Sequence, residues 1–311
     1  MSQITVAQVQ QYTTNVAMLL QQSGSRLRGS VMEHAFVGKA AMMLEQFGSV
    51  TATRNPTRHS DTPVIPTPQD RRWIYPNDRI WADLVDDEDR LRLLIDPMGP
   101  FSTAGSNALG RGIDDEIIYG MLNANMTGEN GTTSTGLLSA YNSGSQVIAS
   151  TVGGAAACGM NIAKLRTAKK ALMLAEVDVD NEQLFVAISA TQHDQLLNET
   201  QAINLDYTTR PVLEDGRIRS FMGFNFILTE RIPGAANFDT VINSAVTGYT
   251  TGSLWLCPFW AKSGVTLGVW NDISASVDKR PDKNNAMQIL VKGTFGGART
   301  EEKRVGLITC V

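Results

Sequence analysis

The stretch RRWIYPNDRIWADL, residues 71–84, sets two tryptophans, a tyrosine and three arginines around one proline turn. Aromatic and β-branched side chains favour strands, and the run Pro76, Asn77, Asp78 is typical of a turn. The pattern therefore predicts extended chain on both sides of the turn. It continues directly into VDDEDRLRLLIDP, residues 85–97, where four consecutive acids precede a leucine-rich run.

The preceding segment, residues 49–68, is rich in threonine and proline. Its prolines exclude both a helix and a central strand, because proline lacks the backbone N–H that either structure needs. Residues 49–85 together are therefore predicted to form a long two-stranded ribbon that projects from the body. An isolated ribbon is only marginally stable in water. The ribbon is expected to dock on another surface.

The charge balance around this ribbon favours a protein partner. Eight acids and five arginines lie between Asp70 and Asp96, a balance of −3 that repels phosphates. Mixed charges suit protein contacts, and Trp, Tyr and Arg are enriched where such contacts are strongest. The candidate interface residues are Arg71, Arg72, Trp73, Tyr75, Arg79 and Trp81.

Composition indicates a folded chain of one large domain or two smaller ones. The chain has 311 residues, 42% hydrophobic and 19% charged, with a net charge of −4. Residues 1–60 hold five basic and two acidic residues, a balance of +3 that leaves −7 for the rest. The first residues lack the pattern of a signal peptide, and no apolar run has the length of a membrane span. A soluble protein is expected.

Apolar spacing predicts the other elements. Residues 6–47 show a broken helical pattern that predicts two helices joined at SGSRLRGS. Residues 101–124 repeat apolar or small side chains every four positions, which predicts one long helix of roughly 36 Å. A second domain is predicted to begin near Ala156 with a helix, strand, helix succession, followed by a strand-rich C-terminal part.

No motif predicts catalysis, a cofactor or a metal. Gly154 and Gly159 have the spacing of a phosphate-binding loop, but Met160 and Asn161 stand where that loop needs lysine and a hydroxyl. The three histidines, His34, His59 and His193, lack metal-ligand spacing. The three cysteines, Cys158, Cys257 and Cys310, show no paired spacing, which favours a reducing compartment over a disulfide framework.

Two acidic clusters have structural interpretations. Asp86, Asp87, Glu88 and Asp89 suit the first turn of a helix, where carboxylates favourably meet the helix dipole. The run Asp114, Asp115, Glu116 is expected to form a polar helix face or to pair with Arg111.

The order of these parts resembles that of a known family. The most specific segments are DRRWIYPNDRIWADLVDDEDRLRLLIDP (residues 70–97) and ALGRGIDDEII (residues 108–118), followed near the end by KGTFGGARTEEKRVGLI (residues 292–308). In this order the chain resembles the major capsid proteins of tailed bacteriophages, over nearly its whole length. The resemblance implies an α+β chain with the Hong Kong 97-type capsid fold.

The resemblance also implies a division of the chain. Residues 1–47 would form an N-terminal arm and residues 48–86 an extended loop that lies over a neighbouring subunit. Residues 87–155 would form a peripheral domain whose spine helix covers 101–124. Most of residues 156–270 would form the axial domain, and the strands of 271–311 would return to the peripheral domain.

A further set of expectations follows from the same resemblance. Pentamers and hexamers of the chain would build an icosahedral shell around double-stranded DNA in the virion, after assembly in the host cytoplasm. Scaffolding, portal and decoration proteins are possible partners, and contact with DNA would be weak and nonspecific. Some members cross-link subunits through a lysine on the extended loop, but residues 48–86 contain no lysine. A shell without this cross-link is expected.

Three other functions stay open from the sequence. An encapsulin-like compartment shares the fold and would enclose an enzyme instead of DNA. An enzyme could assemble its site only in the folded chain, with His193 as a base. A nucleic-acid-binding module would show strong, salt-dependent affinity for DNA.

Overall fold

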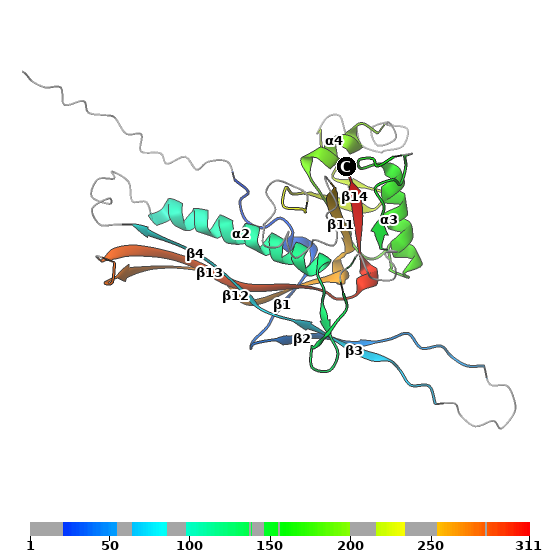
Figure 1. The fold of residues 1–311 in the computed structure, drawn as a ribbon, viewed down its shortest axis with the longest axis horizontal. Helices are drawn as coiled ribbons and strands as arrows, with labels where there is room; N and C mark the ends of the chain where they lie inside the picture. Colours follow the sequence, from blue (N-terminus) through cyan, green and yellow to red (C-terminus); the bar gives the residue numbers. More distant parts are fainter. Residues whose placement is uncertain are drawn as a thin grey trace, which may run out of the picture.

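The computed structural model arranges the chain as helices and strands of three sheets (Figure 1). The described residues are 21–54, 64–85, 98–136, 138, 146–154, 156–199, 216–233, 254–283 and 285–311. Their helices are α2 (Met98–Leu122), α3 (Ile162–Leu174) and α4 (Ala190–Leu197), with 3-10 turns η1 (Arg28–Ser30), η3 (Lys262–Gly264) and η4 (Glu302–Arg304). Their strands are β1 (Met32–Ala35), β2 (Ala41–Phe47), β3 (Gln69–Ile74), β4 (Asn77–Val85), β5 (Met126–Thr127), β6 (Thr133–Ser134), β7 (Val147–Ile148), β8 (Leu184–Ile188), β9 (Ser220–Phe221), β10 (Phe224–Leu228), β11 (Trp255–Ala261), β12 (Val265–Arg280), β13 (Ala286–Arg299) and β14 (Val305–Cys310).

The elongated part of the molecule is a four-stranded sheet, and α2 lies along its length. Its strand order is β1-β12-β13-β4, and we call it the long sheet (Figure 1). Two glycines allow α2 to approach β13 closely, because a Cβ on Gly120 would overlap the backbone of Gly297. The helix ends where the buried Arg299 guanidinium donates a 2.7 Å hydrogen bond to the carbonyl of Met121. Such a cationic cap satisfies a carbonyl that has no partner within the helix.

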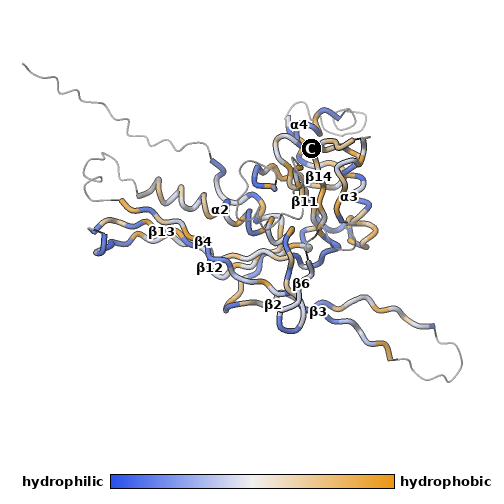
Figure 2. The backbone as a smooth tube through the Cα atoms, in the orientation of Figure 1, coloured by the Kyte–Doolittle hydropathy of each residue, from blue (hydrophilic) through white to orange (hydrophobic). Residues whose placement is uncertain are grey.

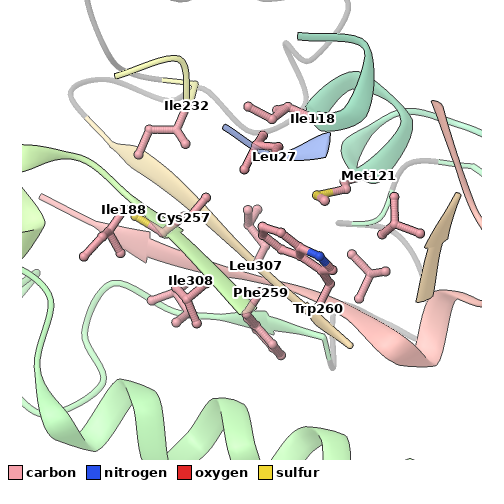
Figure 3. Packing of buried hydrophobic residues seen from close by; sticks show 14 of the residues in the cluster. Leu27, Ile118, Met121, Ile188, Ile232, Cys257, Phe259, Trp260, Leu307 and Ile308 are labelled. Carbon is pink, nitrogen blue, oxygen red and sulfur yellow. The ribbon is translucent and has the colours of Figure 1, made fainter. Parts of the chain in front are cut away.

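The second part is a six-stranded sheet in the order β7-β14-β11-β8-β10-β9, which we call the axial sheet. Every residue of β11 after Trp255 is buried, which is typical of a strand covered on both faces. Helix α3 packs on one face. On the other face, Trp260 lies with Leu27 beside η1 and with Met121 at the end of α2 (Figure 3). One hydrophobic core thus joins the axial sheet to the end of α2.

The third sheet carries the arm. Its order is β2-β3-β5-β6, and we call it the arm sheet. Strands β2 and β3 run antiparallel, and the two chain segments that follow Phe47 and precede Gln69 continue away from the body (Figure 1). A hydrogen bond of 2.7 Å from the Gly48 N–H to the Pro68 carbonyl follows the paired strands. Residues 47–54 and 64–69 form the described arm.

The predicted second helix near the N-terminus is wrong. Within residues 31–47 the structure has strands β1 and β2 in place of that helix. Strand β1 runs parallel to β12, and β2 pairs with β3. Strand β12 lies far along the chain, and β3 lies beyond a loop. The hydrogen bonds that β1 and β2 form with these partners outweigh the local apolar spacing that favours a helix. The first predicted helix lies mostly in residues 1–20, outside the described residues.

The other predicted elements are present with small shifts. The long helix predicted over 101–124 is α2, and the predicted helix, strand, helix succession is α3, β8 and α4. Two strands sit differently from the expected division. Strand β4, expected in the projecting ribbon, pairs with β13 in the long sheet, and β14 joins the axial sheet. Among the described residues, no helix combines the length and apolarity needed to cross a membrane.

Candidate subunit interface

The arm exposes apolar side chains that the subunit does not cover. Phe47 is 66% exposed, Val50 55% and Val64 93%. Hydrophobic positions recur along both described segments of the arm, although the arm lies away from the body (Figure 2). Burial of a Val or Phe side chain contributes roughly 1.5–3 kcal/mol. An arm with several such side chains gains most when a second surface covers it.

A groove of about 980 Å³ runs along the root of the arm. Phe47 and Gln69 line it from the arm, and Glu176, Ser263 and Lys303 line it from the axial part. Charges of both signs border it, since Glu176 and Lys303 are both among its lining residues. A surface that is partly apolar and of mixed charge is typical of a protein interface.

A buried ion pair fixes the root of the arm. Arg72 on β3 donates a 2.6 Å hydrogen bond to the carboxylate of Glu302 on η4, and both side chains are buried. Gln46 on β2 accepts a second hydrogen bond from Arg72 and donates one to the carbonyl of Thr300. The contacts tie both arm strands to the segment between β13 and β14. The direction of the arm is therefore set inside the subunit.

Trp73 and Tyr75 pack on the turn between β5 and β6. The Trp73 indole N–H donates a 2.8 Å hydrogen bond to the Gly128 carbonyl, and the Tyr75 hydroxyl donates one of 3.1 Å to the Gly131 carbonyl. Gly131 has a φ of +65° and lies so close to both rings that a side chain would strain the turn. Tyr75 stays 42% exposed. Of this pair, Tyr75 keeps the larger area for a neighbour.

The remaining predicted interface residues also contact their own subunit. The Arg79 guanidinium donates hydrogen bonds of 3.0 and 2.8 Å to Glu116 on α2. Trp81 lies against α2 at Gly105, where an added Cβ would stand 2.6 Å from the indole ring. Arg71 is half-buried on β3. The structure therefore brings Trp73 and Tyr75 together but holds Arg79 and Trp81 on a different sheet.

Three consecutive acids of α2 each hold a different part of the chain. Asp114 accepts hydrogen bonds from the Ser25 hydroxyl and from the Leu27 N–H, and so fixes the segment before η1. Asp115 pairs with both sides of the Arg231 guanidinium, with one hydrogen bond of 2.6 Å from its Nε. Glu116 holds β4 through Arg79. All three carboxylates are buried, so they form a structural junction in place of the polar surface expected from sequence, while the charge of Asp115 also acts on Arg111.

The other residues considered for chemistry have partners of their own. Asn161 caps the N-terminus of α3 by accepting a hydrogen bond from the Lys164 N–H. In the glycine-rich loop before α3, this side chain thus takes up a backbone N–H of the helix N-terminus. His193 is buried on α4, and its Nε2 accepts a 3.1 Å hydrogen bond from the Ile218 N–H. Burial lowers the pKa of His193, nearby Arg217 lowers it further and Asp194 opposes the shift.

Metal-binding groups do not gather in the described part of the chain. No cluster of three or more His, Cys, Asp or Glu side chains there could hold an ion. His34 is exposed on β1. His59 and the four acids of residues 86–89 lie outside the described residues.

These features define a class of protein. A long helix on a long sheet, an axial sheet with its own helices, and an arm that leaves the body are the parts of the Hong Kong 97-type fold. Ion pairs here hold elements of the subunit together, and the arm carries exposed apolar side chains. The class is that of shell-forming structural subunits.

Comparison with known proteins identifies the family. The family model described as phage capsid protein matches residues 4–311, and the chain belongs to this family. It is a major capsid protein, a structural protein that self-assembles into the icosahedral shell of a virion. No curated protein matches the chain.

Solved capsid structures share the fold at low sequence identity. The capsid protein of cyanophage P-SCSP1u is 13% identical with a TM-score of 0.69, over 98% of this chain and 93% of that chain. The capsid of cyanophage Pam1 is 14% identical with a TM-score of 0.68, over 100% and 99%. The mature capsid of bacteriophage PhiM1 is 10% identical with a TM-score of 0.69, over 96% and 91%. The predicted fold class and family are confirmed.

Proposed function

We propose that this capsid protein forms pentamers and hexamers by laying its arm on a neighbouring subunit, and that the resulting shell encloses double-stranded DNA. The observation that carries the proposal is the exposed apolar surface of the arm, at Phe47, Val50 and Val64. The neighbour covers this surface and fills the groove at the arm root. Each contact needs only modest affinity, because every subunit is held by several neighbours.

The six residues predicted from sequence take different roles in this proposal. Tyr75, together with Arg71, contributes surface to the neighbour. Arg72, Trp73, Arg79 and Trp81 act indirectly, since they fix β3 and β4 to their own subunit and so aim the arm. We further propose assembly in the host cytoplasm with separate scaffolding and portal proteins, optional decoration proteins, and weak nonspecific contact with the packaged DNA.

The test replaces two exposed arm valines and leaves the body unchanged. The double variant Val50→Asp, Val64→Asp should fold, because both side chains are exposed, but it should form no closed particles in negative-stain electron microscopy. The matched control Val50→Ile, Val64→Ile keeps the apolar surface and should assemble like the wild type. Circular dichroism and thermal melting check the fold of both.

Three outcomes of the same preparation bear on the proposal. Closed particles of normal size from the aspartate variant, made alone or with a scaffolding protein, would contradict the role of the arm. Nuclease-resistant DNA inside wild-type particles supports a genome shell, whereas an enzyme cargo would favour an encapsulin-like compartment. Denatured particles should run as single chains, and a ladder of linked chains would refute the expected absence of cross-links.

A further inference from the structure

Two cysteines that are distant in sequence meet inside the axial sheet. Cys257 lies on β11 and Cys310 on its antiparallel neighbour β14, where Cys257 pairs with Ile308 and Cys310 with Trp255. This register makes the two cysteines diagonal neighbours on one face of the sheet. Both side chains are fully buried, and each thiol shifts the pKa of the other. Both are free thiols in the structure.

A buried lysine stands beside this pair. The ammonium group of Lys164, on the first turn of α3, is fully buried and lies 2.6 Å from the Cys158 carbonyl and 2.9 Å from the Thr309 carbonyl. Its third neighbour is the Cys310 sulfur, at 3.8 Å. Within the described part of the chain, no carboxylate pairs with Lys164. A buried cation without a carboxylate partner favours the anionic form of a nearby group, and the nearest group that can become an anion is the Cys310 thiol.

The two thiols are therefore unequal. The hydrogen bond from Cys257 lowers the pKa of Cys310, and the positive charge of Lys164 lowers it further against the effect of burial. The same hydrogen bond, together with burial, raises the pKa of Cys257. Cys310 is thus the thiolate-prone member and Cys257 stays protonated. A thiolate with a protonated thiol next to it is the arrangement of an oxidisable dithiol.

We propose that Cys257 and Cys310 are a redox modification site that closes to a disulfide between β11 and β14 when the shell meets peroxide. The Cys310 thiolate attacks one oxygen of hydrogen peroxide, so that an S–O bond forms, the O–O bond breaks and the released hydroxide takes a proton to become water. Cys257 then attacks the Cys310 sulfur, an S–S bond forms, the S–O bond breaks and a second water leaves. Two thiols lose two electrons and the peroxide gains them.

Access and reversal follow from the position of the pair. Cys310 is fully buried, although the next residue, Val311, is 44% exposed, so a small neutral oxidant reaches the sulfur only through local opening of the strand end. Diagonal partners stand farther apart than directly opposite ones, so closing the bond requires a backbone shift, and we expect a strained bond that a thiol reductant breaks readily. The bond would stabilise the shell after it leaves the reducing cytoplasm, a setting that rests on the proposed function. The chemistry itself does not depend on that function.

The first experiment treats assembled wild-type particles with graded hydrogen peroxide, then denatures them, alkylates the remaining thiols and measures intact mass. The expected product has lost about 2 Da before alkylation and keeps one reactive thiol, on Cys158. Peptide mapping should find Cys257 linked to Cys310, and dithiothreitol should restore all thiols. The proposal would be overturned if wild-type particles that assemble normally keep every thiol, or if they oxidise mainly at Cys158.

Variants separate the roles of the three side chains. Cys158→Ser is the matched control and should form the same linked peptide. Cys257→Ser should form no linked peptide and should instead accumulate oxygen adducts on Cys310. Lys164→Met should slow oxidation roughly tenfold, because it removes the charge that favours the thiolate. An unchanged rate in a folded Lys164→Met variant would refute the part assigned to the lysine, and the wild-type map decides the site if that variant does not fold.

Discussion

At the scale of single residues, Arg72 shows that residue type alone does not reveal which partner a side chain contacts. The sequence marked it as a contact residue because arginine beside tryptophan is common at interfaces. The structure instead buries it against Glu302, which lies 230 positions away along the chain. Within the described residues, one guanidinium nitrogen of Arg72 and one carboxylate oxygen of Glu302 are buried without a hydrogen-bond partner. The pair is therefore costly to hold and costlier to break.

We expect Arg72→Ala to lower the free energy of unfolding by about 3–5 kcal/mol, because it leaves the buried Glu302 charge unpaired. Urea unfolding followed by circular dichroism measures this. The double variant Arg72→Met, Glu302→Met should recover most of the loss, since it removes both charges and keeps the volume. A single variant within about 0.5 kcal/mol of the wild type would show that the ion pair does not hold the arm root.

The candidate interface could be predicted in part. Sequence alone located the arm, because a proline-rich segment without local core has few other structures open to it. It could not show which aromatic and basic residues face outward, since Trp73 and Trp81 are half-buried against glycines of the β5–β6 turn and of α2 that only the fold brings near. It also missed Val50 and Val64, whose ordinary residue type gives no signal of contact.

At the scale of elements, periodic patterns in the sequence predicted those helices and strands that form from local residue spacing. The four-residue repeat of α2 and the apolar runs of the C-terminal strands were sufficient for those elements. Residues 31–47 are an exception to this pattern. Their apolar spacing fits a helix, but most of them pair with β12 or β3 through ladder hydrogen bonds, and pairing between segments separated along the chain leaves no local trace.

Two glycines on α2 give a matched test of helix packing. Gly120→Ala should destabilise the subunit, with a loss of several degrees in melting temperature or loss of soluble protein, because its Cβ would overlap the backbone of Gly297. Gly112→Ala should be neutral or stabilising by up to about 1 kcal/mol, since its Cβ would meet nothing closer than 3.8 Å and alanine favours helices. Equal melting temperatures for the two variants would contradict close packing of α2 on β13.

At the scale of the whole molecule, an ion pair links α2, which lies on the long sheet, to the axial sheet. Asp115 is held on α2, and Arg231 follows strand β10 of the axial sheet. The shared hydrophobic core joins the same two parts. The angle between them is therefore fixed by a directional contact as well as by apolar packing.

We expect Asp115→Asn to loosen this joint without unfolding α2. Hydrogen exchange followed by mass spectrometry should show faster exchange in residues 226–233 and unchanged exchange in the middle of α2. The control Asp180→Asn, at an exposed turn, should leave both regions like the wild type. Faster exchange throughout the molecule would indicate a general loss of stability and would argue against a local joint.

The three acids of α2 have a consequence for where the chain tolerates changes in length. An inserted residue rotates the rest of a helix by about 100° and advances it by 1.5 Å. One insertion shortly before Asp114 would turn the three carboxylates away from the N-terminal segment, the axial sheet and β4 at the same time. Peptide insertions in this part of α2 should therefore be rejected.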